Sequence, residues 1–398
     1  MATIGIDVTA LSTPDSGGMG TAQYRTMRAL SDLDSSHCFV MYAATPPVVP
    51  FSRRPLDLPW LLRLGGGLSA RSNIVWMQTG VNRLLVDDGI DVFWGPRHLL
   101  PLRARGLGKV ATVHDFWDRY YPRQQPWRDR MANRFLIARV VRHADVVVAP
   151  SATTARDAER LCGLASGSAR VVPWGVDPAV FRSLPTEEGG AVLARLGVEG
   201  PYLLSLDVFN PRKNYPVVLA AVSRLSEDIR RPLTLVGIGR RRATAIGADP
   251  REKARALGLD ARVRILDDVD TGDLVALYSG ALALVYPSVY EGFGMPVLEA
   301  MACGCPVITA DRSSLPEVAG DAALLVDPTS SAALADAIAL LATDPDERTR
   351  LAAAGIERTA GFTWRRTAEG MLAAFDEALA MCEGRAPRRA PAGGRRHG

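Results

Sequence analysis

Short apolar segments alternate with longer stretches of helical periodicity along almost the whole chain, and this alternation constrains the fold more than any other feature. The apolar segments are rich in Val, Ile and Leu and lack a polar face, which is typical of strands in a parallel sheet covered by helices. Strands and helices in alternation predict a doubly wound α/β fold. We expect twelve strands, at Ile4–Val8, Phe39–Ala43, Val92–Trp94, Val110–His114, Val146–Ala149, Val171–Val172, Tyr202–Leu206, Leu233–Gly237, Val263–Leu266, Leu282–Tyr286, Val307–Thr309 and Leu324–Val326.

Twelve strands are more than one open sheet usually holds, so two sheets of about six strands each are the simpler solution. Prolines, glutamates and glycines interrupt the pattern around Ser183–Gly200, where we expect the seam between two domains. The sequence therefore predicts an N-terminal Rossmann-like lobe over residues 1–183, a linker over 184–200 and a C-terminal Rossmann-like lobe over 201–363. The ligand-facing loops of both lobes should follow the carboxyl ends of their strands and face a shared cleft.

Two further segments follow the second lobe. A helix is expected over residues 364–382, and it could pack back on the first lobe. Residues 383–398 are rich in Arg, Pro and Gly and have no apolar anchors, so we expect a disordered basic tail.

Composition excludes several classes of protein. Among 398 residues, 47% are hydrophobic and the net charge is only +4, which rules out a mainly disordered chain and a protein that coats nucleic acid. Five scattered cysteines favour reduced thiols over a disulfide framework. The sequence contains no apolar run of membrane-spanning length and begins without a basic leader, so we expect a cytoplasmic protein.

The segment Ser288–Thr309 (SVYEGFGMPVLEAMACGCPVIT) carries the strongest functional signal. Gly294 and the proline that follows it mark the start of a helix after a buried strand, and the free N–H groups of a helix start favour an anion such as phosphate. Glu291 and Glu299 frame this pocket, and each carboxylate can accept hydrogen bonds from sugar hydroxyls. Taken singly, the two could instead be a solvated loop glutamate and a glutamate that stabilises its helix.

The segment Asn210–Asn214 (NPRKN) follows the first strand of the second lobe, at the sheet edge where ligands bind. Arg212 and Lys213 could compensate the charge of a departing diphosphate without a metal ion. Lys213 is one of only three lysines, although an ordinary basic turn remains an alternative.

Two other motifs carry less information. The glycine loop Ser16–Gly20 (SGGMG) follows the first strand but does not fit the dinucleotide fingerprint. Asp268–Asp270 has the form of a metal-binding DxD motif, but Asp270 precedes a helical pattern and is better explained as an N-cap.

In combination, these segments resemble the GT-B glycosyltransferases of family 4, which are retaining enzymes that use nucleotide sugars. The resemblance extends nearly to Met381, and its most specific part is the spacing of Glu291 and Glu299. The supporting motifs, in chain order, are SGGMG, VHD at Val113–Asp115, PSATTARD at Pro150–Asp157, VPWGVD at Val172–Asp177, NPRKN and EGFGMPVLEAMACGCPVI.

The resemblance implies a role for each matching residue. Arg212 and Lys213 would hold the donor diphosphate, Glu299 would bind the nucleotide ribose, and Glu291 would face the transferred sugar. His114 would reach that sugar from the first lobe, unless it is simply a hydrogen-bonded residue at a strand end. The remaining donor-binding residues would be Gly17, Gly18, Phe293, Gly294 and Met295, with no metal ion and no cofactor besides the nucleotide-sugar co-substrate.

Three positions depart from the pattern or have no assigned role. Asp207 stands where the family usually has glycine, and its carboxylate could repel the diphosphate or pair with Arg212 or an acceptor hydroxyl. Asp115 adjoins His114 and remains an uncertain site residue. Trp174 replaces a commoner small or polar residue, without an explanation from the sequence.

We therefore expect a retaining transferase that moves a hexose or deoxyhexose from a nucleotide-diphosphate sugar to a hydroxyl of a glycan, a lipid-linked glycan or a small molecule. The alternatives are a non-hydrolysing nucleotide-sugar epimerase and a catalytically inactive nucleotide-sugar-binding protein. No nucleic-acid partner is expected. The basic helix predicted around Trp127–His143 could touch an anionic membrane, although a solvated arginine face over a packed apolar stripe is the simpler explanation.

Overall fold

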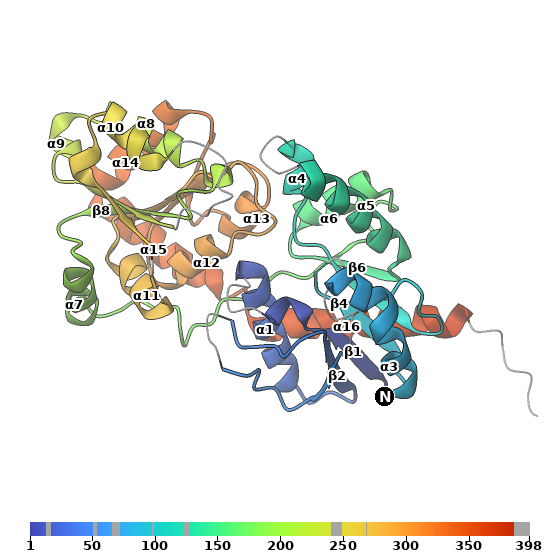
Figure 1. Ribbon diagram of the computed structural model, residues 1–398. Coiled ribbons are helices and arrows are strands. Elements are labelled where there is room, and N and C mark those ends of the chain that lie inside the picture. Colours follow the sequence, from blue (N-terminus) through green and yellow to red (C-terminus); the bar gives the residue numbers. More distant parts are fainter. Residues whose placement is uncertain are drawn as a thin grey trace, which may run out of the picture.

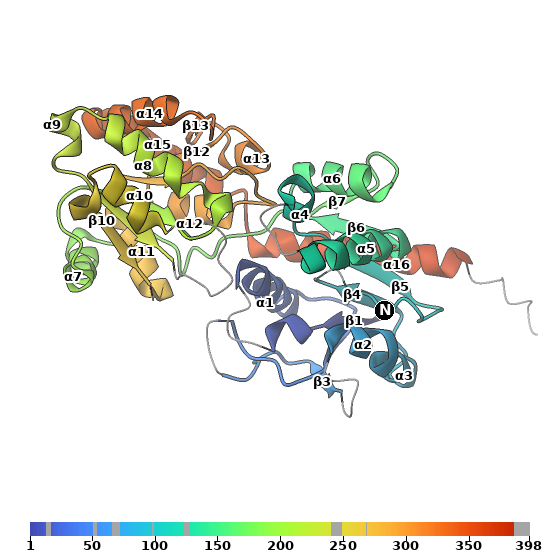
Figure 2. The ribbon, with the colours of Figure 1, turned by 45° about the horizontal axis from the view of Figure 1, so that its top comes forward.

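The structure, a computed structural model, describes residues 1–12, 17–50, 54–65, 72–97, 99–122, 127–239, 249–267 and 269–385. Two lobes lie side by side, and each is built around its own parallel sheet with helices on both faces (Figures 1 and 2). The predicted pair of Rossmann-like α/β lobes is confirmed.

The N-terminal lobe contains a seven-stranded sheet in the order β3-β2-β1-β4-β5-β6-β7, and all its strand pairs are parallel. Its strands are β1 (Thr3–Asp7), β2 (Cys38–Ala43), β3 (Leu61–Leu64), β4 (Val92–Gly95), β5 (Gly108–Thr112), β6 (Val146–Ala149) and β7 (Arg170–Val171). Its helices are α1 (Gly17–Ser31), α2 (Asn73–Val75), α3 (Val81–Asp87), α4 (Trp117–Tyr120), α5 (Trp127–His143) and α6 (Ala152–Cys162).

The C-terminal lobe contains a six-stranded parallel sheet in the order β10-β9-β8-β11-β12-β13. Its strands are β8 (Tyr202–Leu206), β9 (Thr234–Ile238), β10 (Val263–Leu266), β11 (Ala283–Tyr286), β12 (Val307–Ala310) and β13 (Leu324–Val326). Its helices are α7 (Thr186–Leu196), α8 (Tyr215–Arg224), α9 (Glu227–Arg230), α10 (Pro250–Ala256), α11 (Thr271–Gly280), α12 (Met295–Ala302), α13 (Leu315–Ala319), α14 (Ser331–Thr343) and α15 (Pro345–Thr359).

Two sequence predictions about elements were wrong. The first sheet has a seventh strand, β3, which was not expected because Leu61 and Leu64 are exposed at the sheet edge and the segment lacks alternation. The stretch 184–200, expected to be a linker, contains helix α7, whose Leu193 and Leu196 pack against the core of the C-terminal lobe.

The last helix, α16 (Trp364–Arg385), returns to the N-terminal lobe and lies along it, in red in Figure 1. Phe375 and Ala378 belong to that lobe's core, and a Cβ at Gly108 of β5 would lie 2.6 Å from the carbonyl oxygen of Ala378. The helix therefore ties the end of the described chain to the first lobe. It continues through 383–385, which were expected to be disordered, and the rest of the predicted tail lies outside the described residues.

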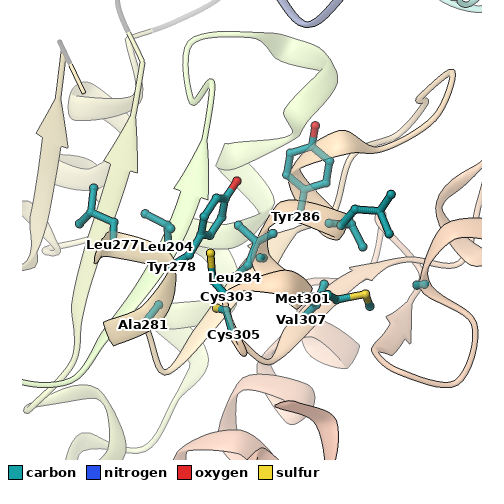
Figure 3. Close-up of a cluster of buried hydrophobic side chains, with 14 of the residues drawn as sticks. Leu204, Leu277, Tyr278, Ala281, Leu284, Tyr286, Met301, Cys303, Cys305 and Val307 are labelled. Carbon is teal, nitrogen blue, oxygen red and sulfur yellow. The ribbon is translucent and has the colours of Figure 1, made fainter. Parts of the chain in front are cut away.

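The core of the C-terminal lobe supports the segment with the strongest functional signal. Leu204, Leu284 and Val307 come from adjacent strands and pack beneath α11 and α12 (Figure 3). Tyr278 and Tyr286 belong to the same cluster, yet their hydroxyl ends point out of it. The two hydroxyls therefore lie at the border of the hydrophobic core, where they can hydrogen-bond to polar residues outside it.

No helix in the described part of the chain is both long and apolar enough to cross a membrane.

Candidate active site

Glu291 is the centre of a buried charged cluster in the loop between β11 and α12. The Lys213 ammonium contacts one of its carboxylate oxygens at 2.6 Å, and the hydroxyls of Tyr286 and Ser288 donate to the same oxygen at 2.9 and 2.7 Å. Burial alone would raise the pKa of Glu291, but the Arg212 guanidinium and the Lys213 ammonium outweigh it and hold that pKa at about 2. Glu291 is therefore ionised at neutral pH.

Lys213 ends a short helical turn (Pro211–Lys213) that follows β8 at the carboxyl edge of the C-terminal sheet. Its side chain is only 9% exposed and also donates to the Tyr286 hydroxyl. Burial lowers the pKa of Lys213, and the attraction of Glu291 opposes this shift. The lysine is thus held inside the lobe by the same groups that hold the glutamate.

Arg212 reaches from the C-terminal lobe to the N-terminal lobe. Its guanidinium donates to Asp115 at 3.1 Å and lies 3.8 Å from Glu291, with its carbon atom 5.8 Å from the centre of the Trp117 ring. Burial would lower the pKa of Arg212, but Glu291 and Asp115 together raise it. Asp115, which had no clear role in the sequence, is therefore the partner of Arg212 across the lobes.

This arrangement corrects one sequence expectation. Arg212 and Lys213 were expected to compensate the charge of a departing diphosphate, without an assigned partner in the protein itself. The structure brings both to one place, as predicted, but Asp115 and Glu291 already balance them. A dianionic ligand therefore has to compete with Asp115 for the arginine, or draw on additional N–H donors.

Additional donors are present at the start of α12. Gly294 caps this helix with a φ of +117°, a conformation that favours glycine, and a Cβ there would lie 2.9 Å from Leu315. Within the described residues, no acceptor is bonded to the backbone N–H groups of Phe293, Gly294 or Met295. Such N–H groups at a helix start attract anions.

Glu299 lies on α12, one turn into the helix. Its carboxylate accepts a hydrogen bond from the Tyr278 hydroxyl at 3.2 Å. Burial raises the pKa of Glu299 to about 7, and the tyrosine hydrogen bond opposes this only in part. Both glutamates of the motif are therefore anchored by a tyrosine from the apolar core, but in opposite electrostatic environments.

The two lobes meet at backbone distance next to Glu291. A Cβ at Gly292 would lie 1.8 Å from the carbonyl oxygen of His114, so only glycine permits this contact. Nearby, the Tyr290 hydroxyl donates to Asp157 at 2.9 Å, and Glu317 accepts hydrogen bonds from the N-terminal N–H groups of α6. Gly292, the first glycine of EGFGMP, is therefore needed for the close contact between the two lobes.

His114 lies two residues beyond β5, where it is buried and lines a small cavity together with Trp174. Its Nε2 atom is bonded to the carbonyl oxygen of Pro96, and burial lowers the pKa of His114 to about 4, so the ring is neutral at pH 7. Trp174 lies between His114 and Phe293, with ring centres 5.4 and 5.3 Å away. This explains Trp174: it joins the aromatic surfaces of the two lobes.

The other predicted site residues divide as follows. Asp207 adopts a φ of +51°, which explains why glycine suits this position, and its carboxylate accepts a hydrogen bond from Asn210 rather than pairing with Arg212. Gly17 and Gly18 begin α1, and a Cβ at either would meet no atom within 4 Å among the described residues.

The prediction that Asp270 of the DVD motif is a helix N-cap is confirmed. Asp270 caps α11 by accepting a hydrogen bond from the N–H group of Asp273, whereas Asp268 lies outside the described residues. Within the described residues, no group of three His, Cys, Asp or Glu side chains is arranged to hold a metal ion.

Three site residues were missed from the sequence. Tyr278, Tyr286 and Ser288 fix the two glutamates by hydrogen bonds. Tyr278 and Tyr286 occur in apolar runs, where an aromatic residue most simply predicts core packing. The signal that could have found Ser288 is its place directly between a buried strand and the glutamate.

Comparison with known proteins agrees with this architecture. Residues 16–180 match the family model described as Glycosyltransferase Family 4, and residues 195–358 match Glycosyl transferases group 1. The fold is similar to sucrose-phosphate synthase from Thermosynechococcus elongatus, with a TM-score of 0.73 over 96% of this chain and 100% of that chain, at 21% identity. It is also similar to Anabaena HepE in complex with UDP and glucose, with a TM-score of 0.72 over 94% and 100% of the two chains, at 16% identity.

Curated relatives are named D-inositol 3-phosphate glycosyltransferase. The protein from Saccharomonospora viridis is 33% identical over 62% of this chain and 59% of its own length. That from Corynebacterium efficiens is 32% identical over 45% of this chain and 44% of its own length. The chain thus spans about half the length of the curated relatives it matches. Two consecutive family models, together with two Rossmann-like lobes, establish that the chain belongs to the GT-B glycosyltransferases of family 4.

Proposed function

We propose that this protein is a retaining glycosyltransferase that moves a hexose or deoxyhexose from a nucleotide-diphosphate sugar to an acceptor hydroxyl. The observation that carries the proposal is the convergence of Arg212, Lys213 and Glu291 beside the N–H groups that open α12, which have no acceptor in the described part of the chain. A diphosphate needs several donors, and an ionised carboxylate such as Glu291 can accept a strong hydrogen bond from a sugar hydroxyl.

The electrostatics of the site support transfer with retention. Glu291 is ionised and His114 is neutral at pH 7, so neither is poised to take up or release a proton near neutrality. In the proposed reaction, the bond from the anomeric carbon to the diphosphate breaks and a bond from the acceptor oxygen forms on the same face. The acceptor's proton passes to the departing diphosphate, which needs no dedicated protein base.

The proposed charge compensation comes from the protein itself. As the diphosphate departs, its charge would be stabilised by Arg212, Lys213 and the N–H groups of Phe293 and Gly294. Glu299 is proposed to accept hydrogen bonds from the nucleotide ribose. We propose on this basis that transfer needs no divalent cation, and activity that is abolished by EDTA and restored by Mg²⁺ or Mn²⁺ would contradict this part.

The names of the relatives favour a small hydroxylated acceptor. Such an acceptor is proposed to enter from the N-terminal lobe, near His114 and Trp174. A glycan or a lipid-linked acceptor would approach the same face, and an acceptor panel that includes inositol phosphates, free sugars and lipid-linked sugars distinguishes them.

The test begins with the donor. Thermal-shift screening against UDP-, GDP-, ADP- and dTDP-sugars should identify one nucleotide that stabilises the protein. Incubation with that donor and the acceptor panel should then give a glycoside with the anomeric configuration of the donor, measured by NMR. Isomerisation of the donor without an acceptor would indicate an epimerase, and tight binding without turnover on any acceptor would indicate an inactive binding protein.

A further inference from the structure

The peptide group between Gly292 and Phe293 is held by hydrogen bonds from the N-terminal lobe. Its carbonyl oxygen accepts hydrogen bonds from the hydroxyls of Ser151 at 2.7 Å and Thr154 at 3.0 Å. Both hydroxyls belong to the start of α6, and both side chains are buried, with exposures of 3% and 0%. Two donors on one carbonyl fix the plane of the peptide to which it belongs.

A fixed carbonyl also fixes the N–H group on the other side of the bond. Each described peptide bond is trans, and in a trans peptide the carbonyl and the following N–H point in opposite directions. With the Gly292 carbonyl turned toward α6, the N–H group of Phe293 must point away from it. This N–H is the first of the donors at the start of α12 that have no acceptor among the residues that the structure describes.

Neighbouring peptides in the loop are held in a different way. Serines of the C-terminal lobe hold them: Ser314 donates to the carbonyl oxygens of Glu291 and Phe293 at 2.9 and 2.7 Å, and Ser313 accepts from the Glu291 N–H at 2.8 Å. Those contacts survive if the lobes separate. The hydrogen bonds to the Gly292 carbonyl do not, because both of their donors lie on the other lobe.

We propose that Ser151 and Thr154 are positioning residues that turn the Phe293 N–H toward the donor diphosphate only when the lobes are in contact. This inference rests on the proposed function, since it assumes that the diphosphate lies at the start of α12. In this proposal, the anion site at the start of α12 is complete only when the two lobes are in contact. Gly292 permits this contact, because no larger residue allows the backbone of the N-terminal lobe to come so close.

Thr154→Val tests the proposal with little change of shape, because valine replaces the hydroxyl with a methyl group. Thr154→Ser keeps the hydroxyl and is the matched control. Ser151 also caps α6 through the N–H group of Thr154, so Ser151→Gly is the second variant, since glycine is tolerated at an N-cap. All variants are compared at matched fractions of folded protein, from thermal unfolding.

The informative readout is the part of nucleotide affinity that the phosphates contribute. Calorimetry gives Kd for UDP, GDP, ADP and dTDP, and competition gives Kd for the nucleoside that matches the tightest of them. Each of Thr154→Val and Ser151→Gly removes one hydrogen bond to the Gly292 carbonyl. Because the Phe293 N–H is then less well oriented, we expect diphosphate binding to weaken about tenfold, with nucleoside binding unchanged. Thr154→Ser should bind both ligands like the natural chain.

The outcomes separate this inference from the proposed function. If the natural chain binds none of the four diphosphates, the proposed function fails and the positioning role with it. If the natural chain binds a diphosphate and Thr154→Val binds it equally tightly, only the positioning role is overturned. Equal loss of diphosphate and nucleoside affinity would indicate a merely structural role for Thr154 and would also overturn it.

Discussion

Replacement of Glu299 by glutamine should stabilise the fold while it weakens nucleotide binding. Burial raises the pKa of this carboxyl from 4.5 to about 7. Between these two pH values the folded chain holds a proton that the unfolded chain has lost, so the free energy of unfolding falls as pH rises through that window. Above pH 7 the whole of this contribution is lost, because the buried carboxylate is then charged in the folded state.

The size of the effect follows from the pKa change. Each pKa unit corresponds to about 1.4 kcal/mol, so a change from 4.5 to about 7 amounts to about 3 kcal/mol above pH 7. This figure is an upper limit, because Glu299 is partly exposed. Glutamine carries no charge and can still accept from Tyr278, so Glu299→Gln should exceed the natural chain in stability at pH 8 and approach it at pH 5.

Urea unfolding at both pH values measures the difference. Glu357→Gln, which changes an exposed glutamate on α15, is the matched control and should show a small effect that is the same at pH 5 and pH 8. In calorimetry, Glu299→Gln should weaken nucleoside diphosphate binding by one to two orders of magnitude, roughly the value of a charged hydrogen bond. An equal stability change at both pH values would refute the burial argument, and an unaltered Kd would refute the ribose contact.

Three further substitutions test the site. Lys213→Ala should lower kcat/KM by about two to three orders of magnitude and also destabilise the fold, since it leaves Glu291 buried with one cation fewer; unchanged kinetics in the folded variant would remove the lysine from the site. Gly292→Ala should abolish transfer while the thermal midpoint changes little, because a methyl group there collides with His114 and keeps the lobes apart; an active variant in kinetic assays would contradict the need for this contact. Asp115→Asn should tighten nucleoside diphosphate binding by roughly tenfold in calorimetry, because it removes the anion that competes for its arginine partner; weaker binding would show that the aspartate supports the ligand instead.

The sequence was most informative where local pattern and tertiary structure agree. Runs without a polar face, such as Tyr202–Leu206, predicted buried parallel strands because burial on both faces leaves no other solution. Strand β3 was missed because an edge strand needs only one partner, and its exposed leucines follow no alternation. Helix α7 was missed because glycine and proline weaken local helix signals, whereas packing against α11 compensates for that weakness.

The sequence predicted that Arg212, Lys213 and Glu291 lie together, but it did not predict how they pair. The spacing of Glu291 and Glu299 placed the first glutamate in the loop before a helix and the second within that helix, and the basic pair in NPRKN followed the adjacent strand. The partner of Arg212 could not be predicted, because Asp115 is 97 residues away on the other lobe and only lobe contact brings the two together. The roles of Tyr278 and Tyr286 likewise depend on where their hydroxyls emerge from the core.

A crystal structure with the tightest-binding nucleoside diphosphate tests the central claim most directly. The account predicts that the two phosphates lie within hydrogen-bonding distance of Arg212 or Lys213 and of the N–H groups of Phe293 and Gly294, with the ribose at Glu299. A diphosphate bound away from both the basic pair and the start of α12 would contradict it, whatever activity the protein has.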